Sequence, residues 1–310
     1  MESENGTVSR GAEPSDKMLS KGFGRYQFLE TVCTAAAVIG VLGCVAAALF
    51  FRQILLASAF FALAAVGILV GHQVQKRKKE RIHLILGDFF RTELERVFGP
   101  ELQLPELAID ERFLRSSRLT GRVWEKCEIH SDYQGTRRGV PFSAANVTLT
   151  HTYQRHISGQ EGTTTCTTEM LRGVVIRCKT ALSTPARVSV RGRIDPEDPD
   201  KIRTSDPTFN RRFITESDSP ASALSLLTPL FLGALRTLEE SFRDEMVGLI
   251  WESDTLTLAF NTRYIFADVP VELDARNIDA LRRWYTASLE GMGGVLDILM
   301  DNSALLQAKT

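Results

Sequence analysis

The chain of 310 residues carries 37 Lys and Arg against 38 Asp and Glu, so its formal net charge of −1 gives no global field that would select nucleic acid or a membrane. Its five cysteines are scattered without CxxC or other metal-like spacing, which is typical of reduced thiols and argues against a disulfide framework. The length allows a membrane anchor and one further domain of ordinary size.

Two uncharged apolar stretches, Thr31–Phe51 and Ile54–Gly71, dominate the start of the chain. Each approaches the ~20 residues that a helix needs to cross ~30 Å of hydrocarbon. Only Arg52 and Gln53 separate them, so the chain has to reverse direction, and the pattern predicts an antiparallel transmembrane hairpin over residues 28–72. Neither stretch contains Asp, Glu, Lys or Arg, which argues against an ion or proton path and favours an anchor.

Small residues recur at helical spacing within the hairpin. They let two helix backbones approach closely in lipid, where no hydrophobic drive brings helices together. We expect the hairpin to pack on itself, with oligomerisation as the alternative. The small residues concerned are Ala36, Gly40, Gly43, Ala47, Ala57, Ala62, Ala65 and Gly67.

The flanks of the hairpin are basic. Residues 1–27 are polar and are predicted to form a disordered tail, with Lys21 and Arg25 close to the first span. A basic run follows the second span, whereas the connecting turn offers only Arg52. The positive-inside rule therefore predicts that both termini are cytoplasmic.

The basic run is also a candidate contact for anionic lipid, at ~1 kcal/mol per charge near the surface. Its residues are Lys76, Arg77, Lys78, Lys79 and Arg81. The alternative is that it sets topology and does nothing more. Residues 73–100 are expected to form a basic, amphipathic connecting helix that ends before Gly99-Pro100. Its apolar residues recur at helical spacing: Ile82, Ile85, Leu86, Phe89, Phe90, Val97 and Phe98.

Residues 101–310 predict one cytosolic α+β domain. Helical structure is expected over 102–119, and period-two alternation then predicts a strand at Val147–Tyr153. Further strands are expected at Thr163–Thr168, Val174–Cys178 and Arg187–Arg191, followed by a hairpin of Met246–Trp251 and Leu256–Phe260 that turns at Glu252–Asp254. The predicted fold class is α+β: a two-helix transmembrane hairpin followed by a mainly antiparallel sheet with flanking helices.

Three helix starts share one pattern, an N-cap side chain followed by proline at the first helical position. They are Asp206-Pro207, Ser219-Pro220 and Thr228-Pro229. They predict a short turn over 207–212 and helices over 221–227 and 230–241, the last two nearly collinear with a break or kink at Thr228. A longer helix is expected over 275–300, with Ile278, Leu281, Tyr285, Leu289, Met292, Leu296 and Leu299 on its apolar face.

Short motifs recur in the later domain at Asp206–Phe213, Ser217–Pro220, Leu226–Pro229 and Leu256–Phe260. Together they resemble the bacterial domain-of-unknown-function family 3137, over roughly Glu80–Val269. Leu171–Val175 lies where that family tends to show F-x-G-x-F, and aliphatic residues here replace both aromatics. The resemblance implies a pair of N-terminal membrane helices, a strand-rich middle and then the D-P-x-F-N and L-T-P segments. The family has no assigned activity.

His130 and Asp132 form the candidate catalytic pair. They lie two residues apart and would share one face of a regular strand, where a carboxylate can orient a histidine as a general base. No nucleophile motif such as G-x-S-x-G accompanies them, so polar residues of an edge strand are the simpler interpretation.

No metal or cofactor site is predicted. His151 and His156 would face opposite sides of a regular strand, and neither GxxxxGK[ST] nor GxGxxG between a strand and a helix occurs. Arginines make the strand region locally basic without an interleaved aromatic platform, which favours a sheet that faces an anionic membrane over nucleic acid. They are Arg118, Arg122, Arg137, Arg138, Arg172, Arg177, Arg187, Arg191 and Arg193.

These patterns predict a multi-pass protein of the bacterial inner membrane whose cytosolic domain is a binding or scaffold module for a protein partner or anionic lipid headgroups. The alternative is a membrane-anchored enzyme with its site near His130 and Asp132. A channel or transporter would need polar residues inside the spans, and these are absent.

Overall fold

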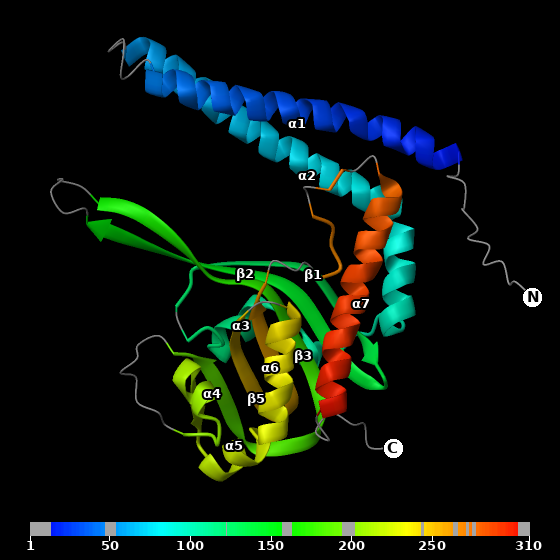
Figure 1. The fold of residues 1–310 in the computed structure, drawn as a ribbon, viewed down its shortest axis with the longest axis vertical. Coiled ribbons are helices and arrows are strands. Elements are labelled where there is room, and N and C mark those ends of the chain that lie inside the picture. Colours follow the sequence, from blue (N-terminus) through cyan, green and yellow to red (C-terminus); the bar gives the residue numbers. More distant parts are fainter. Residues whose placement is uncertain are drawn as a thin grey trace, which may run out of the picture. The chain divides into compact units, whose positions relative to one another are not determined.

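The computed structural model is an α+β protein with two N-terminal apolar helices and a five-stranded antiparallel sheet flanked by helices, as predicted (Figure 1). It forms two compact units, Met1–Phe90 with Val269–Trp284, and Arg91–Asp268 with Tyr285–Thr310. The residues that the structure describes are 14–46, 54–121, 123–156, 163–193, 202–242, 245–262, 266–270, 273–274 and 277–302.

The first unit contains helix α1 (Pro14–Ala46) and most of helix α2 (Ile54–Phe98). Both are long and apolar enough to cross a membrane, over Phe28–Ala46 in α1 and within Ser58–Phe98 in α2. At 45 residues α2 is about 68 Å long. It therefore extends well beyond ~30 Å of hydrocarbon and includes the basic run.

The seam between α1 and α2 is built from small residues, as predicted. A Cβ on Gly40 would lie 2.6 Å from the backbone N of Ala64 and 2.8 Å from the carbonyl oxygen of Phe60, so no larger side chain fits there. Gly67 approaches α1 in the same way, since a Cβ added to it would lie 3.0 Å from the backbone N of Ala37. Ala37 lies next to Gly67, whereas Gly40, later in α1, lies next to Ala64, which is earlier in α2. The helices are therefore antiparallel, and the hairpin packs on itself.

The start of α1 differs from the prediction. The helix begins at Pro14, so residues 14–27 are helical where the polar composition predicts a disordered tail. An existing helix adds each further residue at little cost, and Lys, Met and Leu in this stretch are good helix formers. Residues 1–13 and 47–53 lie outside the described residues, so the turn expected at Arg52 and Gln53 stays a prediction.

The sheet has one central strand, β3 (Thr163–Gly192). One of its edges pairs with β2 (Val140–His156) and, further along, with β4 (Phe213–Ser217). Its other edge pairs with β5 (Glu245–Asn261). Strand β1 (Lys126–Arg137) pairs with β2 at the outside, and all of these pairings are antiparallel (Figure 1).

Two strand predictions are corrected by this topology. The three strands expected at Thr163–Thr168, Val174–Cys178 and Arg187–Arg191 are one continuous strand. The hairpin expected to turn at Glu252–Asp254 does not form, because β5 runs straight through that segment and pairs with β3 on both sides of it.

A paired irregularity explains both corrections. The register of β3 shifts around Thr184, opposite Ser253, which has a positive φ of 53°. The hydroxyls of Thr180 and Thr184 donate to the carbonyl oxygens of Leu182 and Ala186, each at 2.7 Å, so the displaced backbone remains hydrogen-bonded. Turn-forming residues here make a β-bulge inside a ladder instead of a loop between strands.

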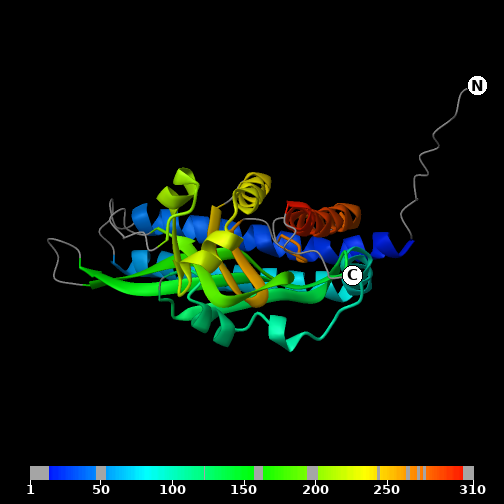
Figure 2. The ribbon, with the colours of Figure 1, turned by 90° about the horizontal axis from the view of Figure 1, so that it is seen from below.

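The two faces of the sheet are covered by different elements, which gives three layers (Figure 2). On one face, Val147, Leu149 and Leu171 pack with Trp124 and Leu114 in a core that includes α3 (Glu111–Ser117). The 3-10 helix η2 (Pro105–Leu107) precedes α3, so the 102–119 region holds two short helices, as expected.

The other face is covered by α6 (Pro229–Phe242) and by the part of α7 (Ile278–Asn302) that belongs to the second unit. Phe231 of α6 lies 5.6 Å from Trp251 of β5, centroid to centroid. The apolar face expected for the long C-terminal helix is buried throughout, including Tyr285, Leu289 and Leu296. At the end of α2, the ring of Phe98 lies 5.0 Å from that of Phe142 on β2.

The capped helix starts are confirmed at α4 (Pro207–Arg212) and α5 (Pro220–Leu226), where Asp206 and Ser219 accept hydrogen bonds from the first turn. Phe231 N likewise donates to the Thr228 hydroxyl at 3.3 Å. The expectation that α5 and α6 are nearly collinear is wrong, because their axes bend by 60°. Proline at position 229 lacks the N–H that would continue α5, so α6 starts as a new helix.

Gly173 generates the first prediction. A Cβ on Gly173 would overlap the carbonyl oxygen of Phe260 and lie 2.7 Å from the backbone N of Thr262, so Gly173→Ala forces β3 and β5 apart. We expect a loss of about 3 kcal/mol or more in the free energy of unfolding, at the upper end for overpacking. The control is Gly192→Ala in the same strand, whose Cβ would meet nothing closer than 3.8 Å. Equal thermal stability of the two variants would contradict this account.

Candidate functional site

The basic run on α2 is the first candidate site. We call the exposed or half-exposed cations Lys76, Arg77, Lys79 and Arg81 the basic collar. Arg77 and Arg81 are four residues apart and therefore neighbours on one face of the helix. The guanidinium of Arg81 lies 5.7 Å from the centroid of Tyr26 on α1 and donates to its hydroxyl at 3.3 Å, which holds this arginine in place.

Lys78 does not belong to the collar, because its side chain is buried against α1. Its side chain is 7% exposed, and its Nζ lies 3.5 Å from a carboxylate oxygen of Glu30 on α1. Gln75 donates to the other carboxylate oxygen of Glu30 at 3.1 Å. Of the five cations considered as lipid contacts, Lys78 therefore serves the seam of the hairpin. Glu30 lies outside the basic run, so the spacing of cations alone gave no sign of this pair.

Leu84 is a feature that the sequence pattern missed. It is 84% exposed and follows Arg81 by three residues, on the same side of α2. An apolar side chain beside arginines is the composition of helices that lie at a membrane interface. Ile82 and Leu86 define the apolar face of this helix by their spacing, and Leu84 lies off that face. The spacing therefore does not predict a role for Leu84.

The His130–Asp132 pair does not have the geometry expected of it. The register of β1 shifts between His130 and Tyr133, and Ser131 between them has a positive φ of 51°. A bulge there breaks the alternation that would put both side chains on one face. The contact of His130 is with Glu128, at 3.8 Å, and both side chains are exposed. Among the described residues, no contact joins His130 to Asp132.

A different histidine has a carboxylate partner. His151 Nδ1 lies 2.8 Å from Glu125 Oε1, and the backbone N–H of Thr152 donates to Oε2 of the same carboxylate at 2.7 Å. These two bonds, the backbone one first, hold the pKa of Glu125 below its usual value. His151 also stacks on Tyr153. Within the described part of the chain, neither His151 nor Glu125 contacts a hydroxyl or thiol that could act as a nucleophile.

Several arginines of the strand region tie elements together, a role that the sequence pattern did not predict. Arg137 binds Asp297 of α7 through two hydrogen bonds, at 3.0 and 2.5 Å. Arg177 donates to the Ala108 carbonyl oxygen at 2.6 Å and lies 3.8 Å from the centroid of Phe113. Burial lowers the pKa of Arg177. Similar ties are Arg138–Asp301, Arg187–Ser117, Arg191–Glu216 and Arg193–Asn210.

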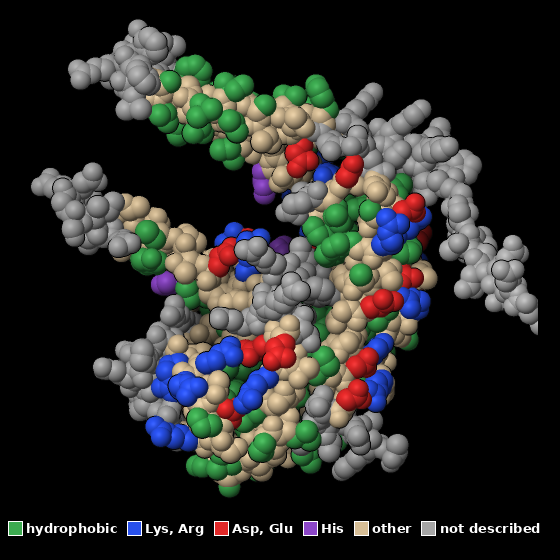
Figure 3. Space-filling model, in the orientation of Figure 1, with side chains coloured by type: hydrophobic (Ala, Val, Ile, Leu, Met, Phe, Trp, Pro, Cys, Tyr) green, Lys and Arg blue, Asp and Glu red, His purple; other side chains and the backbone are tan. Residues whose placement is uncertain are grey.

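The D-P-x-F-N segment has a local structural role. The carboxylate of Asp206 accepts from the backbone N–H of Thr208 and Phe209, at 2.9 and 3.2 Å. Asn210 binds the backbone of Thr204 through both ends of its amide, each at 2.9 Å. Positive and negative side chains lie next to one another over α4 and α6 (Figure 3). Within the described ranges, no group of three or more His, Cys, Asp or Glu side chains could hold a metal.

Comparison with known proteins supports the family resemblance. Residues 167–300 match the family model described as "Protein of unknown function (DUF3137)". This confirms the family expected from the short motifs, although the match begins at residue 167 instead of near Glu80 and extends into α7. The matched segment includes Gly173 and the capped starts of α4, α5 and α6.

No curated protein matches the chain. Among solved structures, it is similar to a chain described as "crystal structure of the mycobacterial trehalose monomycolate transport factor A, TtfA". The two are 13% identical, the similarity covers 56% of this chain and 76% of that one, and the TM-score is 0.24.

The ion pair in the seam generates the second prediction. Lys78→Met leaves the carboxylate of Glu30 without its cation, and Glu30 is only 26% exposed. Removing one partner of a fully buried pair costs ~3–5 kcal/mol, and partial exposure reduces this to about 1–3 kcal/mol here. The control, Lys76→Met, removes an exposed cation from the same helix and should cost less than about 0.5 kcal/mol. Thermal unfolding in detergent measures both. A larger loss from Lys76→Met would refute the pairing.

Proposed function

We propose that this chain, whose residues 167–300 match a family of unknown function, is a membrane-tethered binding module of the bacterial inner membrane. The two apolar helices anchor it, the basic collar contacts anionic headgroups of the inner leaflet, and the α+β domain recruits a protein partner. Both termini are cytoplasmic in this proposal, because the cations flank the spans on the side of the termini.

The observation that carries the proposal is the division of charge along α2. Thr31–Phe51 and Ile54–Gly71 contain no Asp, Glu, Lys or Arg, which supports a tether over a transport path. Beyond them, Arg77 and Arg81 lie on one exposed face next to Leu84. Arginine forms two parallel hydrogen bonds to a phosphate, and neighbouring arginines can bind one headgroup together.

The third prediction tests the lipid contact. Arg77→Gln with Arg81→Gln removes two surface charges at ~1 kcal/mol each, so we expect about 30-fold weaker binding of phosphatidylglycerol to the full chain. Native mass spectrometry in a mild detergent measures the retained lipid. The matched control is Arg112→Gln with Arg172→Gln, which removes two exposed charges from the domain and should leave lipid binding unchanged.

A topology reporter accompanies this measurement, because cations beside a span also set its orientation. Reporters fused at either terminus should signal from the cytoplasm in the wild type and in the double variant. Equal loss of lipid in both double variants would contradict a collar-specific contact. A C-terminal reporter active in the periplasm would contradict the inner-leaflet placement.

The alternative, a membrane-anchored enzyme, has its best geometric support at His151 and Glu125 instead of at His130 and Asp132. A carboxylate that orients a histidine is half of a general-base arrangement. The pair lies at the edge of the sheet with both side chains partly exposed, and neither residue lines the cavity between α4 and α6. We therefore favour the binding module.

The fourth prediction separates the module from the enzyme. His151→Ala with Glu125→Ala, and His130→Ala with Asp132→Ala, should each leave the cellular phenotype of the gene intact at normal protein level. Deletion of residues 1–72 should abolish it, because tethering raises the local concentration of the domain at the membrane. The opposite pattern, loss with either double variant, would support the enzyme.

A further inference from the structure

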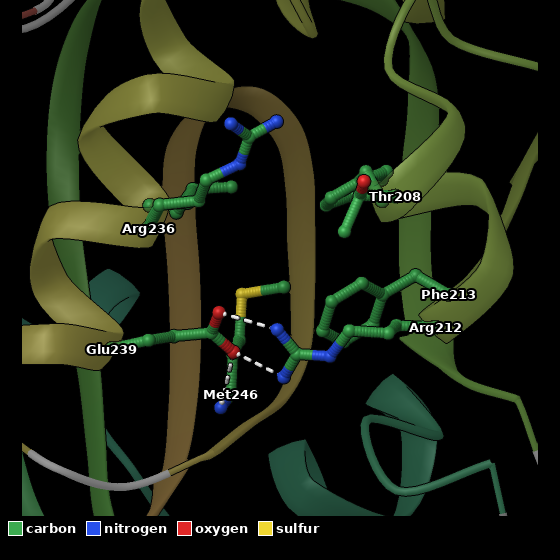
Figure 4. A pocket seen from close by; sticks show the side chains of 8 residues that line it. Thr208, Arg212, Phe213, Arg236, Glu239 and Met246 are labelled. Carbon is green, nitrogen blue, oxygen red and sulfur yellow. Dashed lines mark hydrogen bonds and ion pairs between the residues drawn. The ribbon is translucent and has the colours of Figure 1, made fainter.

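A cleft lies between α4 and α6 (Figure 4). Its floor is apolar and buried: Phe209, Phe213, Leu235 and Met246 are each at most 7% exposed, and the centroids of the two phenylalanine rings lie 4.8 Å apart. The hollow has a volume of about 60 Å³. Sites for drug-sized ligands and cofactors usually have ~300–1,000 Å³, so this one admits a single small side chain instead of a whole metabolite.

The rim of the cleft is charged, with the cations outside. Arg212 binds both carboxylate oxygens of Glu239 at 2.8 Å, and the arginine side chain is 43% exposed while the glutamate is 14% exposed. Arg236 likewise pairs with Asp206, and the arginine side chain is 55% exposed while the aspartate is 11% exposed. Figure 4 shows Arg236 directed away from Glu239. The acidic partners lie inside and the guanidinium groups face solvent, so the mouth presents positive charge.

The rim is held in place by neighbouring groups. Glu239 accepts a third hydrogen bond from the backbone N–H of Met246, at 3.1 Å. Arg211, exposed on α4, donates at 3.2 Å to the hydroxyl of Thr208, which lines the cleft, and adds a cation beside it. Asp206 fixes the first turn of α4 through its capping bonds. A partner would meet a preformed site and lose little free energy in ordering it.

We propose that this cleft docks an acidic segment of a protein partner, which inserts one small apolar side chain, such as that of valine, while flanking carboxylates meet Arg211, Arg212 and Arg236. The proposal rests on the module function and names the partner's chemistry. An apolar pocket surrounded by polar groups is the usual anatomy of an energetic centre in a protein interface. Arg211 and Arg236 are exposed, and a guanidinium carries five N–H donors, so each can bind a carboxylate in addition to its present partner.

The experiment uses the full chain in nanodiscs of neutral lipid and three fluorescent pentapeptides, read by anisotropy. The first is Glu-Asp-Val-Asp-Glu, the second replaces the central valine with glycine, and the third replaces all acids with lysine. We expect the first to bind, the second to bind about tenfold more weakly, and the third not to bind. Binding of the first should weaken with added salt.

Two exposed positions supply the variants, so that the fold is retained. Thr208→Trp covers the mouth, and Arg211→Glu reverses a rim charge without breaking the Arg212–Glu239 or Arg236–Asp206 pair. Both should reduce binding of the valine peptide at least tenfold with unchanged thermal unfolding. The control is Arg112→Glu, the same charge change at an exposed position of α3, and it should bind like the wild type.

Three outcomes would overturn the proposal. They are equal affinity for the valine and glycine peptides, wild-type affinity of Thr208→Trp, and displacement of the peptide by phosphatidylglycerol that depends on Arg211. The last would assign the cleft to lipid headgroups. The double variant of Arg77 and Arg81 should bind the valine peptide normally. Disabling the collar should therefore lower lipid binding and leave peptide binding unchanged. Disabling the cleft should lower peptide binding and leave lipid binding unchanged.

Discussion

The domain depends on one strand that is paired along both edges. β3 is the only partner of β4 and β5 among the described strands and joins both to the β1–β2 pair. That arrangement requires close approach at Gly173, which pairs with Val147 on one side and Asn261 on the other. A side chain at this position would separate β5, which carries Trp251 and Phe260, from the rest of the core. The helices on both faces then cover a surface that β3 has assembled.

Local chemistry was enough to predict some elements and not others. A capping side chain followed by proline has one preferred geometry, so Asp206-Pro207 and Ser219-Pro220 start helices as expected. The apolar spacing of α7 is equally local and was predicted in full. In contrast, whether Ser253 forms a turn or a bulge is decided by the strand opposite it, and sequence spacing carries no information on that partner. The same reason separates His130 from Asp132.

The number of arginines in a stretch of sequence likewise does not predict how many of them are exposed in the fold. A row of arginines in the strand region suggested a basic surface, yet Arg137, Arg177 and Arg187 point at carboxylates or backbone carbonyls of neighbouring elements. Among the described residues, exposed cations lie close together in the collar on α2 and at the mouth of the α4–α6 cleft. Sequence reasoning located the first from its density of charge. It missed the second, because Arg212 and Arg236 are distant in the chain and line one cleft only through the packing of two helices.

The pair of Glu30 and Lys78 also limits how the two apolar helices can move against each other. A slip of α2 by one turn, ~5.4 Å, would place Glu30 opposite Val74 or Ile82 and would move Gly40 away from Ala64. The first change would leave the charge of Glu30 facing apolar side chains. The second would place a larger residue at the closest contact of the two backbones. Sliding of one helix along the other is therefore energetically unfavourable. A signal that crossed this anchor would have to travel by tilt or rotation of the two helices together, and not by a piston-like stroke of one of them.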